Sequence, residues 1–338
     1  MRKWRTVLVG LGRIGMMDAD DPLVSRHYRY ASHAQVLAEH ASFLWEAAVD
    51  PSAECLQVAR DRWRVRIAVR SVAELRELCA PEIAVIATPP RDRRAIVEAL
   101  PDLRGVLVEK PLGETLREAE DFVAYCTRRG IRVQVNLWRR ADEVFRELAT
   151  GRLQELVGRP QAVFGVYGNG LLNNGTHMID FVRMLCGEIR SVQAVGGVAP
   201  YRAGPIAKDV NIPFTVVLQD GTVVMLQPVR FEHYRENGLD IWGDRARLAI
   251  VQEGLRILLY PQREHRAVPG EREIESEHPR ALPSTVGSAL YHVYSNLADA
   301  LAGETPLWSP GDAAVQAARV IDAVRISARE DGMQVAVC

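Results

Sequence analysis

The sequence predicts a two-domain α/β protein. The first domain is a doubly wound parallel sheet, and the second is an α+β domain with an open, mostly antiparallel sheet. Two observations indicate this. Over residues 1–137, short apolar segments alternate with helical segments, which is typical of parallel sheets. Within the second domain, residues 138–338, the strand-like segments over residues 192–260 follow one another without helices between them.

The composition excludes several classes of protein. The 338 residues are 48% hydrophobic and 25% charged, with a net charge of −1, as in ordinary globular proteins. Neither a nucleic-acid partner nor a membrane is expected, because there is no basic excess and no apolar run long enough to span a bilayer. The cysteines are scattered and lack metal-ligand spacing, so we expect reduced thiols, a cytoplasmic location and no metal site. They are Cys55, Cys79, Cys126, Cys186 and Cys338.

Each element of the first domain has its own local pattern. Apolar runs bounded by turn residues predict the strands, and an N-terminal proline, the Ser71 cap and the stop at Gly130 help to delimit the helices. The predicted strands are 6–9, 43–49, 67–69, 83–87, 106–108 and 133–137. The predicted helices are 51–60, 72–78, 92–100, 114–129 and one that begins near His33.

A glycine triplet, Gly10-Leu11-Gly12-Arg13-Ile14-Gly15, follows the first strand directly. At this spacing the first glycine allows a tight turn, the second lets the backbone approach a pyrophosphate, and the third allows close packing of helix on strand. Free N–H groups and a helix N-terminus then face the negative charge. The pattern predicts a Rossmann domain in which Gly10, Gly12, Arg13, Ile14 and Gly15 bind a dinucleotide.

Polar side chains and lysine follow the ends of other predicted strands. Asp50 ends the second, Thr88 and Pro89 follow the strand at 83–87, and Glu109 and Lys110 follow the strand at 106–108. The carboxyl ends of parallel strands share one edge of a sheet, where doubly wound folds bind their ligands. We therefore expect these five residues to contribute to the cofactor site.

Asp50 predicts the choice of cofactor. An acidic residue at this place accepts hydrogen bonds from the adenosine ribose and repels a 2′-phosphate, so NAD is expected over NADP. Arg13 leaves NADP as an alternative, because an arginine in the glycine loop could cover that phosphate. Asp50 follows Gly15 by 35 residues, against a usual spacing of about 20, which indicates an insertion over residues 16–32. This segment is either a surface loop or an overhang above nicotinamide and substrate.

The second domain is predicted to be a mixed or antiparallel sheet with a few helices. Asp220-Gly221 is typical of the tip of a hairpin. The predicted strands are 192–198, 213–218, 222–229, 239–242 and 255–260. The predicted helices are 171–185, 288–301 and 312–329.

Five motifs together resemble the Gfo/Idh/MocA oxidoreductases, and they occur in the same order over essentially the whole chain. They are the glycine triplet, the acid Asp50, Thr88-Pro89-Pro90, Glu109-Lys110-Pro111 and Asn173-x-Gly175-x-His177-x-x-Asp180. The resemblance implies oxidation or reduction of sugars, cyclitols or related polyols with NAD or NADP. It also implies that the second domain carries substrate residues and builds a homodimer or homotetramer, and that Lys110 and His177 line the reacting carbon.

Hydride transfer to or from a secondary alcohol requires a proton carrier and a donor that stabilises charge on the oxygen. Lys110 and His177 are suited to these tasks. Asn173 stands where the family has an aspartate, so it can orient His177 or substrate but cannot supply a negative charge. Asn173 is therefore the third expected catalytic residue. Tyr28 and Arg139, together with Asn173, are expected to contact substrate.

Four glutamates alternate at Glu271, Glu273, Glu275 and Glu277, so an extended backbone would place them on one face. Two interpretations are open. The face could be a solvated edge strand protected by charge, or an acidic wall that attracts a cationic substrate such as an aminosugar.

The leading hypothesis for function is an NAD(P)-dependent dehydrogenase acting on a secondary alcohol or ketone of a sugar, aminosugar or cyclitol. One alternative uses the same redox step to hydrolyse a glycoside through a transient ketone. Another is a dinucleotide sensor without catalysis. Retention of Lys110 and His177 argues against a sensor, whereas Asn173 argues mildly for it.

Overall fold

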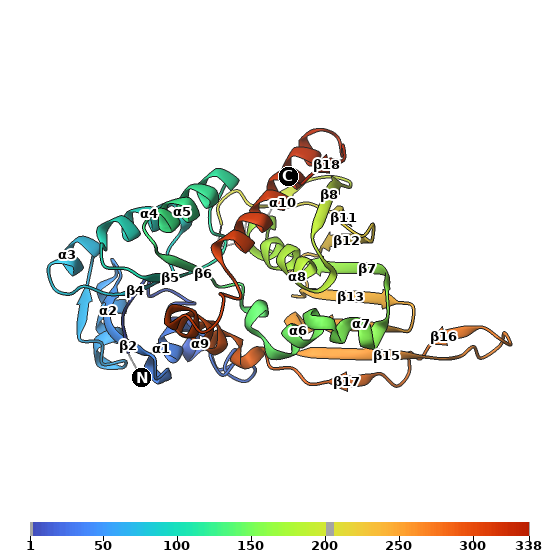
Figure 1. Ribbon diagram of the computed structural model, residues 1–338, viewed down its shortest axis with the longest axis horizontal. Coiled ribbons are helices and arrows are strands. Elements are labelled where there is room, and N and C mark those ends of the chain that lie inside the picture. Colours follow the sequence, from blue (N-terminus) through green and yellow to red (C-terminus); the bar gives the residue numbers. More distant parts are fainter. Residues whose placement is uncertain (1–2, 201–205, 338) are drawn as a thin grey trace. The chain divides into compact units, whose positions relative to one another are not determined.

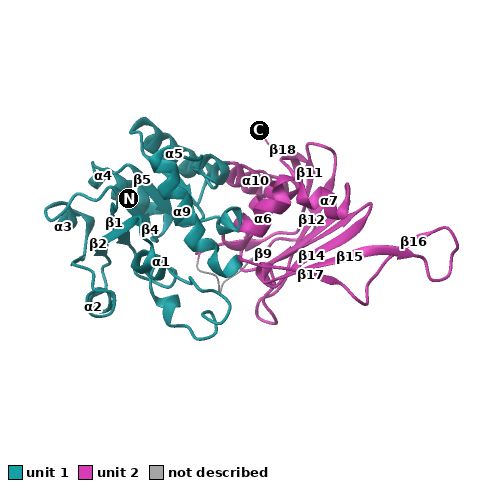
Figure 2. Ribbon diagram, turned by 60° about the horizontal axis from the view of Figure 1, so that its bottom comes forward, with its two compact units in different colours: residues 1–142, 286–315 teal, residues 143–285, 316–338 magenta. Residues whose placement is uncertain are grey.

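The computed structural model describes residues 3–200 and 206–337, and the chain divides into two compact units (Figure 2). Unit 1 comprises Met1–Asp142 and Val286–Val315, and unit 2 comprises Glu143–Thr285 and Gln316–Cys338. Cys338 lies outside the described residues. No helix of the described segments has the length and apolar character needed to cross a membrane.

Unit 1 contains a six-stranded parallel sheet in the order β3-β2-β1-β4-β5-β6 (Figure 1). This is the strand order of dinucleotide-binding folds. Successive strands are added toward one edge from β1 to β3 and toward the other edge from β4 to β6, so the order changes direction between β1 and β4. The strands are β1 (Trp4–Val9), β2 (Phe43–Val49), β3 (Ile67–Val69), β4 (Ile83–Ile86), β5 (Gly105–Val108) and β6 (Arg132–Val135). The predicted doubly wound parallel sheet is thereby confirmed.

Four helices of unit 1, α1, α2, α3 and α5, begin where a polar side chain caps a free N–H group. Ser32, Ser52, Ser71 and Thr115 each accept a backbone N–H three residues further on. The helices are α1 (His33–Glu39), α2 (Ala53–Asp61), α3 (Val72–Arg76), α4 (Pro90–Ala99), α5 (Leu116–Arg128) and α9 (Ala289–Ala302). Short turns of helix are η1 (Met17–Asp20), η2 (Trp138–Ala141) and η6 (Val286–Ser288).

Helix α9 belongs to unit 1, although the division at residue 137 placed this segment in the second domain. It contacts α1, β5 and β6. Its apolar residues Leu290, Val293 and Leu297 share one buried core with Leu8 and Val36. Burial of this face against the parallel sheet explains why the segment joins the N-terminal unit.

Unit 2 contains a mixed sheet in the order β16-β15-β14-β13-β7-β12-β11-β8-β18, with β17 paired to β15. Among the described residues of this sheet, β7 and β12 form the one parallel pair of strands, which confirms the mostly antiparallel prediction. The strands are β7 (Pro160–Tyr167), β8 (Ile189–Ala194), β11 (Phe214–Leu218), β12 (Val223–Pro228), β13 (Gly238–Gly243), β14 (Ala246–Val251), β15 (Arg256–Glu264), β16 (Arg272–Ile274), β17 (Arg280–Leu282) and β18 (Val335–Ala336). A separate pair joins β9 (Ala199–Pro200) to β10 (Val210–Asn211).

Helices cover one face of this sheet (Figure 1). Helix α8 contacts β7, and α7 contacts β13 and β14. On the other face Phe164, Val223 and Met225 are 48%, 52% and 44% exposed. The helices of unit 2 are α6 (Glu143–Glu147), η3 (Leu148–Arg152), α7 (Leu153–Val157), η4 (Leu171–Gly175), α8 (Thr176–Cys186) and η5 (Gln252–Gly254). Helix α10 (Gly311–Arg329) begins in the residues of unit 1 and ends in those of unit 2.

Candidate active site

The glycine loop of unit 1 shows a different constraint at each glycine. Gly10 has a φ of +92°, and a Cβ there would lie 2.8 Å from the Ala87 carbonyl oxygen. A Cβ at Gly15 would overlap the carbonyl oxygen of Gly10. At Gly12 a Cβ would meet nothing within 4 Å. Packing therefore demands glycine at 10 and 15, whereas Gly12 leaves the outer side of the loop open.

The open side of this loop presents hydrogen-bond donors. Among the described residues, the backbone N–H groups of residues 12–15 find no protein acceptor. Successive N–H groups in such a turn form a concavity that binds anions. The loop therefore fits the pyrophosphate of a dinucleotide, and Gly12 leaves room for it.

The insertion predicted at 16–32 is looped out from the start of α1. The His33 N–H donates to Ile14 O and the Ala34 N–H to Gly15 O, each at 2.9 Å, so the helix continues directly from the glycine loop. The insertion is attached to the unit by Tyr30. Its hydroxyl donates to Glu39 at 2.8 Å, and its ring lies 4.9 Å from that of Tyr291.

Two side chains near the glycine loop, Asp50 and Arg13, were predicted to influence the choice between NAD and NADP. The two oxygens of Asp50 accept the N–H groups of Leu11 at 2.7 Å and Ser52 at 2.8 Å. Because a carboxylate has about four acceptor sites, capacity remains for ribose hydroxyls. Arg13 is 79% exposed and donates to Asp18 of the insertion at 2.9 Å.

Arg93 joins the loops after β4 and β5. Its guanidinium is buried, with the residue 2% exposed, and it donates to Thr88 O at 3.2 and 3.0 Å and also to Pro111 O. Burial lowers the pKa of Arg93 to about 10, so it is charged at neutral pH. Thr88 and the half-buried Lys110 are thus fixed at neighbouring strand ends, as the sequence predicted. Pro89 is exposed beside them.

Glu109, by contrast, lies inside unit 1. One of its oxygens, Oε1, is 3.1 Å from His33 Nε2 and 2.5 Å from Asn136 Nδ2. The other ring nitrogen of His33 is 2.8 Å from the Tyr294 hydroxyl. Burial raises the pKa of Glu109, but the hydrogen bonds of His33 and Asn136 and the charge of Lys110 outweigh it, so the net shift is downward.

Sequence reasoning missed the two hydrogen-bond partners of Glu109, which are His33 and Asn136, and also Tyr294, the partner of His33. His33 is the first residue of α1, immediately after the insertion, and Asn136 follows β6 at the edge where ligands bind. These positions could have drawn attention to both residues. Tyr294 offers no such sign, because it lies far along the chain on an apolar helix.

In unit 2, Asn173 and His177 lie on one helical segment formed by η4 and α8. Asn173 is buried and His177 is half-buried near the start of α8. Asp180 is also buried, 3.6 Å from Arg183 within the same helix. The structure thus brings the residues of this motif onto neighbouring turns of one segment.

Asp209 holds the start of that segment and was not foreseen. Its carboxylate accepts the N–H groups of Leu172 and Asn173, each at 3.1 Å, and that of Val210 at 2.9 Å. A Cβ at Gly170 would overlap this carboxylate, which explains the glycine. Burial raises the pKa of Asp209 despite these three hydrogen bonds.

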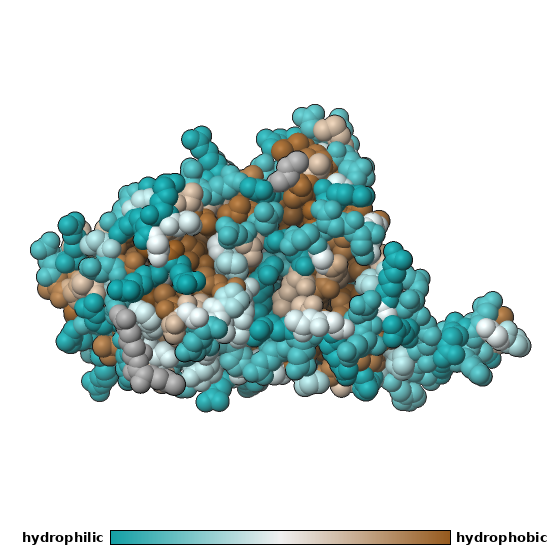
Figure 3. Space-filling model, viewed as in Figure 1, coloured by the Kyte–Doolittle hydropathy of each residue, from teal (hydrophilic) through white to brown (hydrophobic). Residues whose placement is uncertain are grey.

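The alternating glutamates belong to a hairpin of β15 and β16 that extends beyond the rest of the unit 2 sheet and carries mainly hydrophilic residues (Figure 3). Glu273 pairs with Arg263 at 2.7 Å and with Arg266 at 2.6 Å. Arg263 also pairs with Glu275 at 2.5 Å. Arginines therefore pair with two of the four alternating glutamates, Glu273 and Glu275, which weakens the case for an acidic wall.

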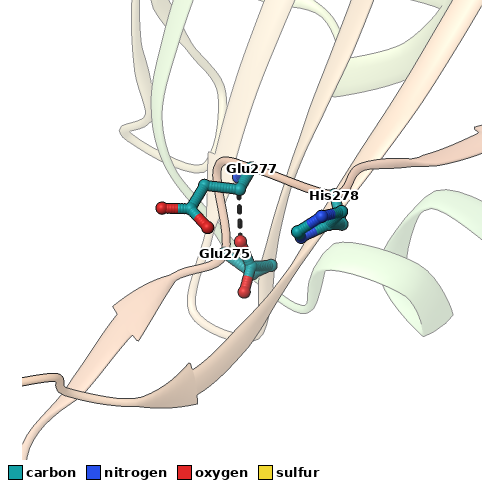
Figure 4. A group of neighbouring side chains, drawn as sticks. All are labelled: Glu275, Glu277 and His278. Carbon is teal, nitrogen blue, oxygen red and sulfur yellow. Dashed lines mark hydrogen bonds between the residues drawn. The ribbon is translucent and has the colours of Figure 1, made fainter.

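Glu275, Glu277 and His278 lie near one another on this hairpin (Figure 4), with ligand atoms within 4.8 Å. Glu275 already accepts the Glu277 N–H at 2.8 Å as well as the Arg263 ion pair. The group is largely exposed, and acidic residues often gather on surfaces without an ion. We assign no metal to it.

The strand order and the anion-binding glycine loop define unit 1 as a dinucleotide-binding domain. The chain belongs to the Gfo/Idh/MocA oxidoreductase family. The family model for the NAD-binding Rossmann fold matches residues 4–137, and the model for the C-terminal α/β domain matches residues 166–337. Its cofactor is NAD. A search of curated proteins found no match.

Solved structures share this fold at low sequence identity. Levoglucosan dehydrogenase in complex with NADH is 16% identical, with a TM-score of 0.76 and 100% coverage of both chains. The WlbA dehydrogenase from Bordetella pertussis, in complex with NADH and UDP-GlcNAcA, is 18% identical, with a TM-score of 0.71 and coverage of 100% of this chain and 99% of that one. An oxidoreductase from Agrobacterium radiobacter, in complex with NAD+, L-tartaric acid and magnesium, is 16% identical, with a TM-score of 0.73 and coverage of 99% and 98%.

Proposed function

We propose that this protein is an NAD-dependent dehydrogenase that transfers a hydride between nicotinamide and a secondary alcohol or ketone of a sugar or cyclitol. The observation that carries the proposal is the set of groups at one edge of the unit 1 sheet. There the loop of residues 12–15, the carboxylate of Asp50 and the half-buried Lys110 follow β1, β2 and β5, whose carboxyl ends share that edge. Family membership supports the redox chemistry.

The bound cofactor supplies the hydride acceptor or donor. In our proposal the N–H groups of residues 12–15 bind the pyrophosphate and Asp50 accepts the ribose hydroxyls. The ammonium of Lys110 stabilises charge that develops on the substrate oxygen, and His177 takes or returns the hydroxyl proton. Asn173 orients His177 or the substrate through neutral hydrogen bonds.

Tyr28, Arg139 and Asn173 are the substrate contacts of this proposal. Arg139 is buried, with its guanidinium 4.3 Å from the centre of the Trp138 ring, so its plane is fixed. The aminosugar version of the proposal loses its support, because arginines neutralise Glu273 and Glu275. A neutral polyol is therefore the substrate class that we favour.

The test is a panel of polyols, sugars, aminosugars, nucleotide sugars and anhydrosugars such as levoglucosan, mixed with NAD or NADP while nicotinamide absorbance is followed. Stoichiometric formation of NADH by any of these alcohols is the expected result. Glycoside cleavage that needs only catalytic NAD would favour the hydrolytic alternative. Tight NAD binding without turnover of any compound would favour the sensor and contradict the proposal.

We also propose that the chain forms a homodimer or homotetramer through the uncovered face of the unit 2 sheet. Phe164, Val223 and Met225 give this face an apolar character that is unusual for a surface exposed to water. Light scattering after size exclusion measures the mass, and Phe164→Arg should lower it to that of one chain. A monomeric wild-type protein would contradict this.

A further inference from the structure

Four buried side chains of unit 1 form a continuous line of hydrogen bonds that ends at the residue before Lys110. His33 and Tyr294 are each 0% exposed, Asn136 is 4% and Glu109 is 9% exposed. The line runs from the Tyr294 hydroxyl to His33 Nδ1 at 2.8 Å and from His33 Nε2 to Glu109 Oε1 at 3.1 Å. Asn136 donates to the same oxygen from the other side at 2.5 Å.

The direction of the line follows from its chemistry. Burial and the nearby Glu109 raise the pKa of Tyr294 well above its ordinary value, so Tyr294 keeps its proton and can donate to His33 Nδ1. In that tautomer His33 carries its proton on Nε2 and donates to Glu109. His33 and Asn136 therefore both donate to Oε1 of Glu109, and they stabilise its ionised form, which can only accept hydrogen bonds.

The charge of a neighbouring residue also stabilises the ionised form of Glu109. Lys110 favours ionised Glu109, and Glu109 in turn favours the charged form of Arg93 on α4. The only large opposing effect is burial, which by itself raises the pKa of a carboxyl. Removal of the His33 donor would leave only Asn136 and Lys110 to oppose burial, so the pKa of Glu109 would rise and the carboxylate would take up a proton at a higher pH.

We propose that His33 and Tyr294 are positioning residues of the proton-transfer step, which hold Glu109 as an oriented anion and so give Lys110 a fixed counter-charge. The proposal rests on the proposed function, because it assumes that Lys110 takes part in the reaction. It assigns no contact with substrate to His33 or Tyr294.

A second buried histidine offers a comparison. His40 directly follows α1 as its C-cap, and its Nε2 lies 3.0 Å from Ser295 of α9. His40 thus joins the same two helices as His33 does, but its bond ends at a hydroxyl, not at a carboxylate. His40→Asn is therefore a matched control for the loss of a buried helix–helix hydrogen bond.

The first measurement is the pH dependence of kcat. His33→Asn keeps a polar group toward Tyr294 but withdraws the donor from Glu109. We expect this variant to gain an acidic limb, with kcat about tenfold or more below wild type near pH 6 and recovering as pH rises. Tyr294→Phe should show a smaller limb, and His33→Gln, whose amide reaches the place of Nε2, should restore the wild-type profile. His40→Asn should keep that profile.

The second measurement does not depend on activity or bound cofactor. The chain has three lysines, Lys3, Lys110 and Lys208, so reductive ¹³C-methylation gives a simple NMR spectrum. Lys110→Arg assigns the Lys110 signal, and Lys3 and Lys208 are internal references. Between about pH 5 and about pH 8 the Lys110 signal of wild type should be flat, because Glu109 stays ionised. In His33→Asn it should show a step, which Glu109→Gln added to that variant abolishes.

The outcomes separate the two proposals. A flat Lys110 signal together with a wild-type kcat profile in His33→Asn would overturn the positioning role. If His33→Asn does not fold, Tyr294→Phe decides by the same two readouts. If wild type turns over no substrate, or Lys110→Ala keeps full turnover, the proposed function fails, while the NMR titration still reports whether His33 controls the charge of Glu109.

Discussion

The two units position their candidate functional residues in different ways. In unit 1 the glycine loop, Asp50 and Lys110 follow parallel strands that end at one edge of the sheet, so backbone topology places them at that edge. In unit 2 the start of the segment that carries Asn173 and His177 is held by Asp209, which is 36 residues away from Asn173 along the chain. Both sets of residues lie in local sequence motifs, but only the structure reveals the distant carboxylate that supports the second set.

The largest expected effect compares one catalytic candidate from each unit. Lys110→Ala and His177→Ala should each lower kcat by about two to four powers of ten, as expected for the loss of an acid–base group. NAD affinity, measured by calorimetry, should change far less in both. If either variant keeps wild-type turnover, the substituted residue takes no part in the proton transfer.

The next comparison tests backbone geometry within the glycine loop of unit 1. Gly10→Ala introduces a Cβ at positive φ against Ala87, so we expect a loss of about 1–3 kcal/mol in the free energy of unfolding. Gly12→Ala meets no neighbour and should leave stability within about 0.5 kcal/mol while weakening NAD binding. Urea unfolding and NAD titration measure the two effects. Equal losses of stability in Gly10→Ala and Gly12→Ala would show that the two glycines are not under different steric constraints.

The corresponding test in unit 2 is Asp209→Asn. The amide would place a donor where the N–H of Asn173 needs an acceptor, which should cost about 1–3 kcal/mol of stability and lower kcat. Asp220→Asn, in an exposed hairpin turn where Asp220 accepts from Thr222, is the matched control and should keep kcat. An unchanged kcat in Asp209→Asn would show that this carboxylate supports folding only.

A smaller effect is expected for cofactor preference. Asp50→Ser keeps a polar side chain but removes the charge that disfavours a 2′-phosphate, so the preference for NAD over NADP should shrink by about tenfold. The ratio of kcat/KM for the two cofactors measures it. Equal or tighter binding of NADP by the wild-type protein would contradict the role assigned to Asp50.

The smallest expected effect is on the pH dependence of the free energy of unfolding, which should differ between the two buried carboxylates, Glu109 and Asp209. The pKa of Glu109 is lowered in the folded state, so its contribution to stability is present above about 4.5 and is lost as pH falls through the folded value. The pKa of Asp209 is raised, so its contribution is complete below about 3.8 and is lost as pH rises through the folded value. Urea unfolding of Glu109→Gln and Asp209→Asn across this range should give stability differences from wild type with opposite slopes.

Much of unit 1 was predictable from sequence because its rules are local. Apolar runs, the Ser71 cap and the glycine triplet predicted its sheet and most of its helices. The line through Glu109 was not predictable, because His33 and Tyr294 are 261 residues apart. Nor was the assignment of α9 to unit 1, since an apolar helix face does not reveal the sheet on which it packs.

Unit 2 was predicted less completely for an equally physical reason. Strand β7 was missed because Pro160 and Gly165 are residues that normally weaken a strand. In the folded sheet Pro160 is the first residue of the strand, and a Cβ at Gly165 would overlap Leu226 of the neighbouring strand. The Leu226 side chain thus fills the space beside the glycine, a packing relation that only the three-dimensional structure reveals.

The looped-out insertion has a consequence for how this domain can evolve. The chain passes from the nucleotide-binding turn to α1 through the carbonyl groups of Ile14 and Gly15, and the N–H groups of residues 16–18 also bond back to that turn. The middle of the insertion, residues 19–29, makes none of these bonds. Lengthening or shortening such a segment twofold changes the free energy of loop closure by only about 0.6 kcal/mol. Residues 19–29 can therefore change in evolution and alter the surroundings of the cofactor, while the turn that binds it is kept.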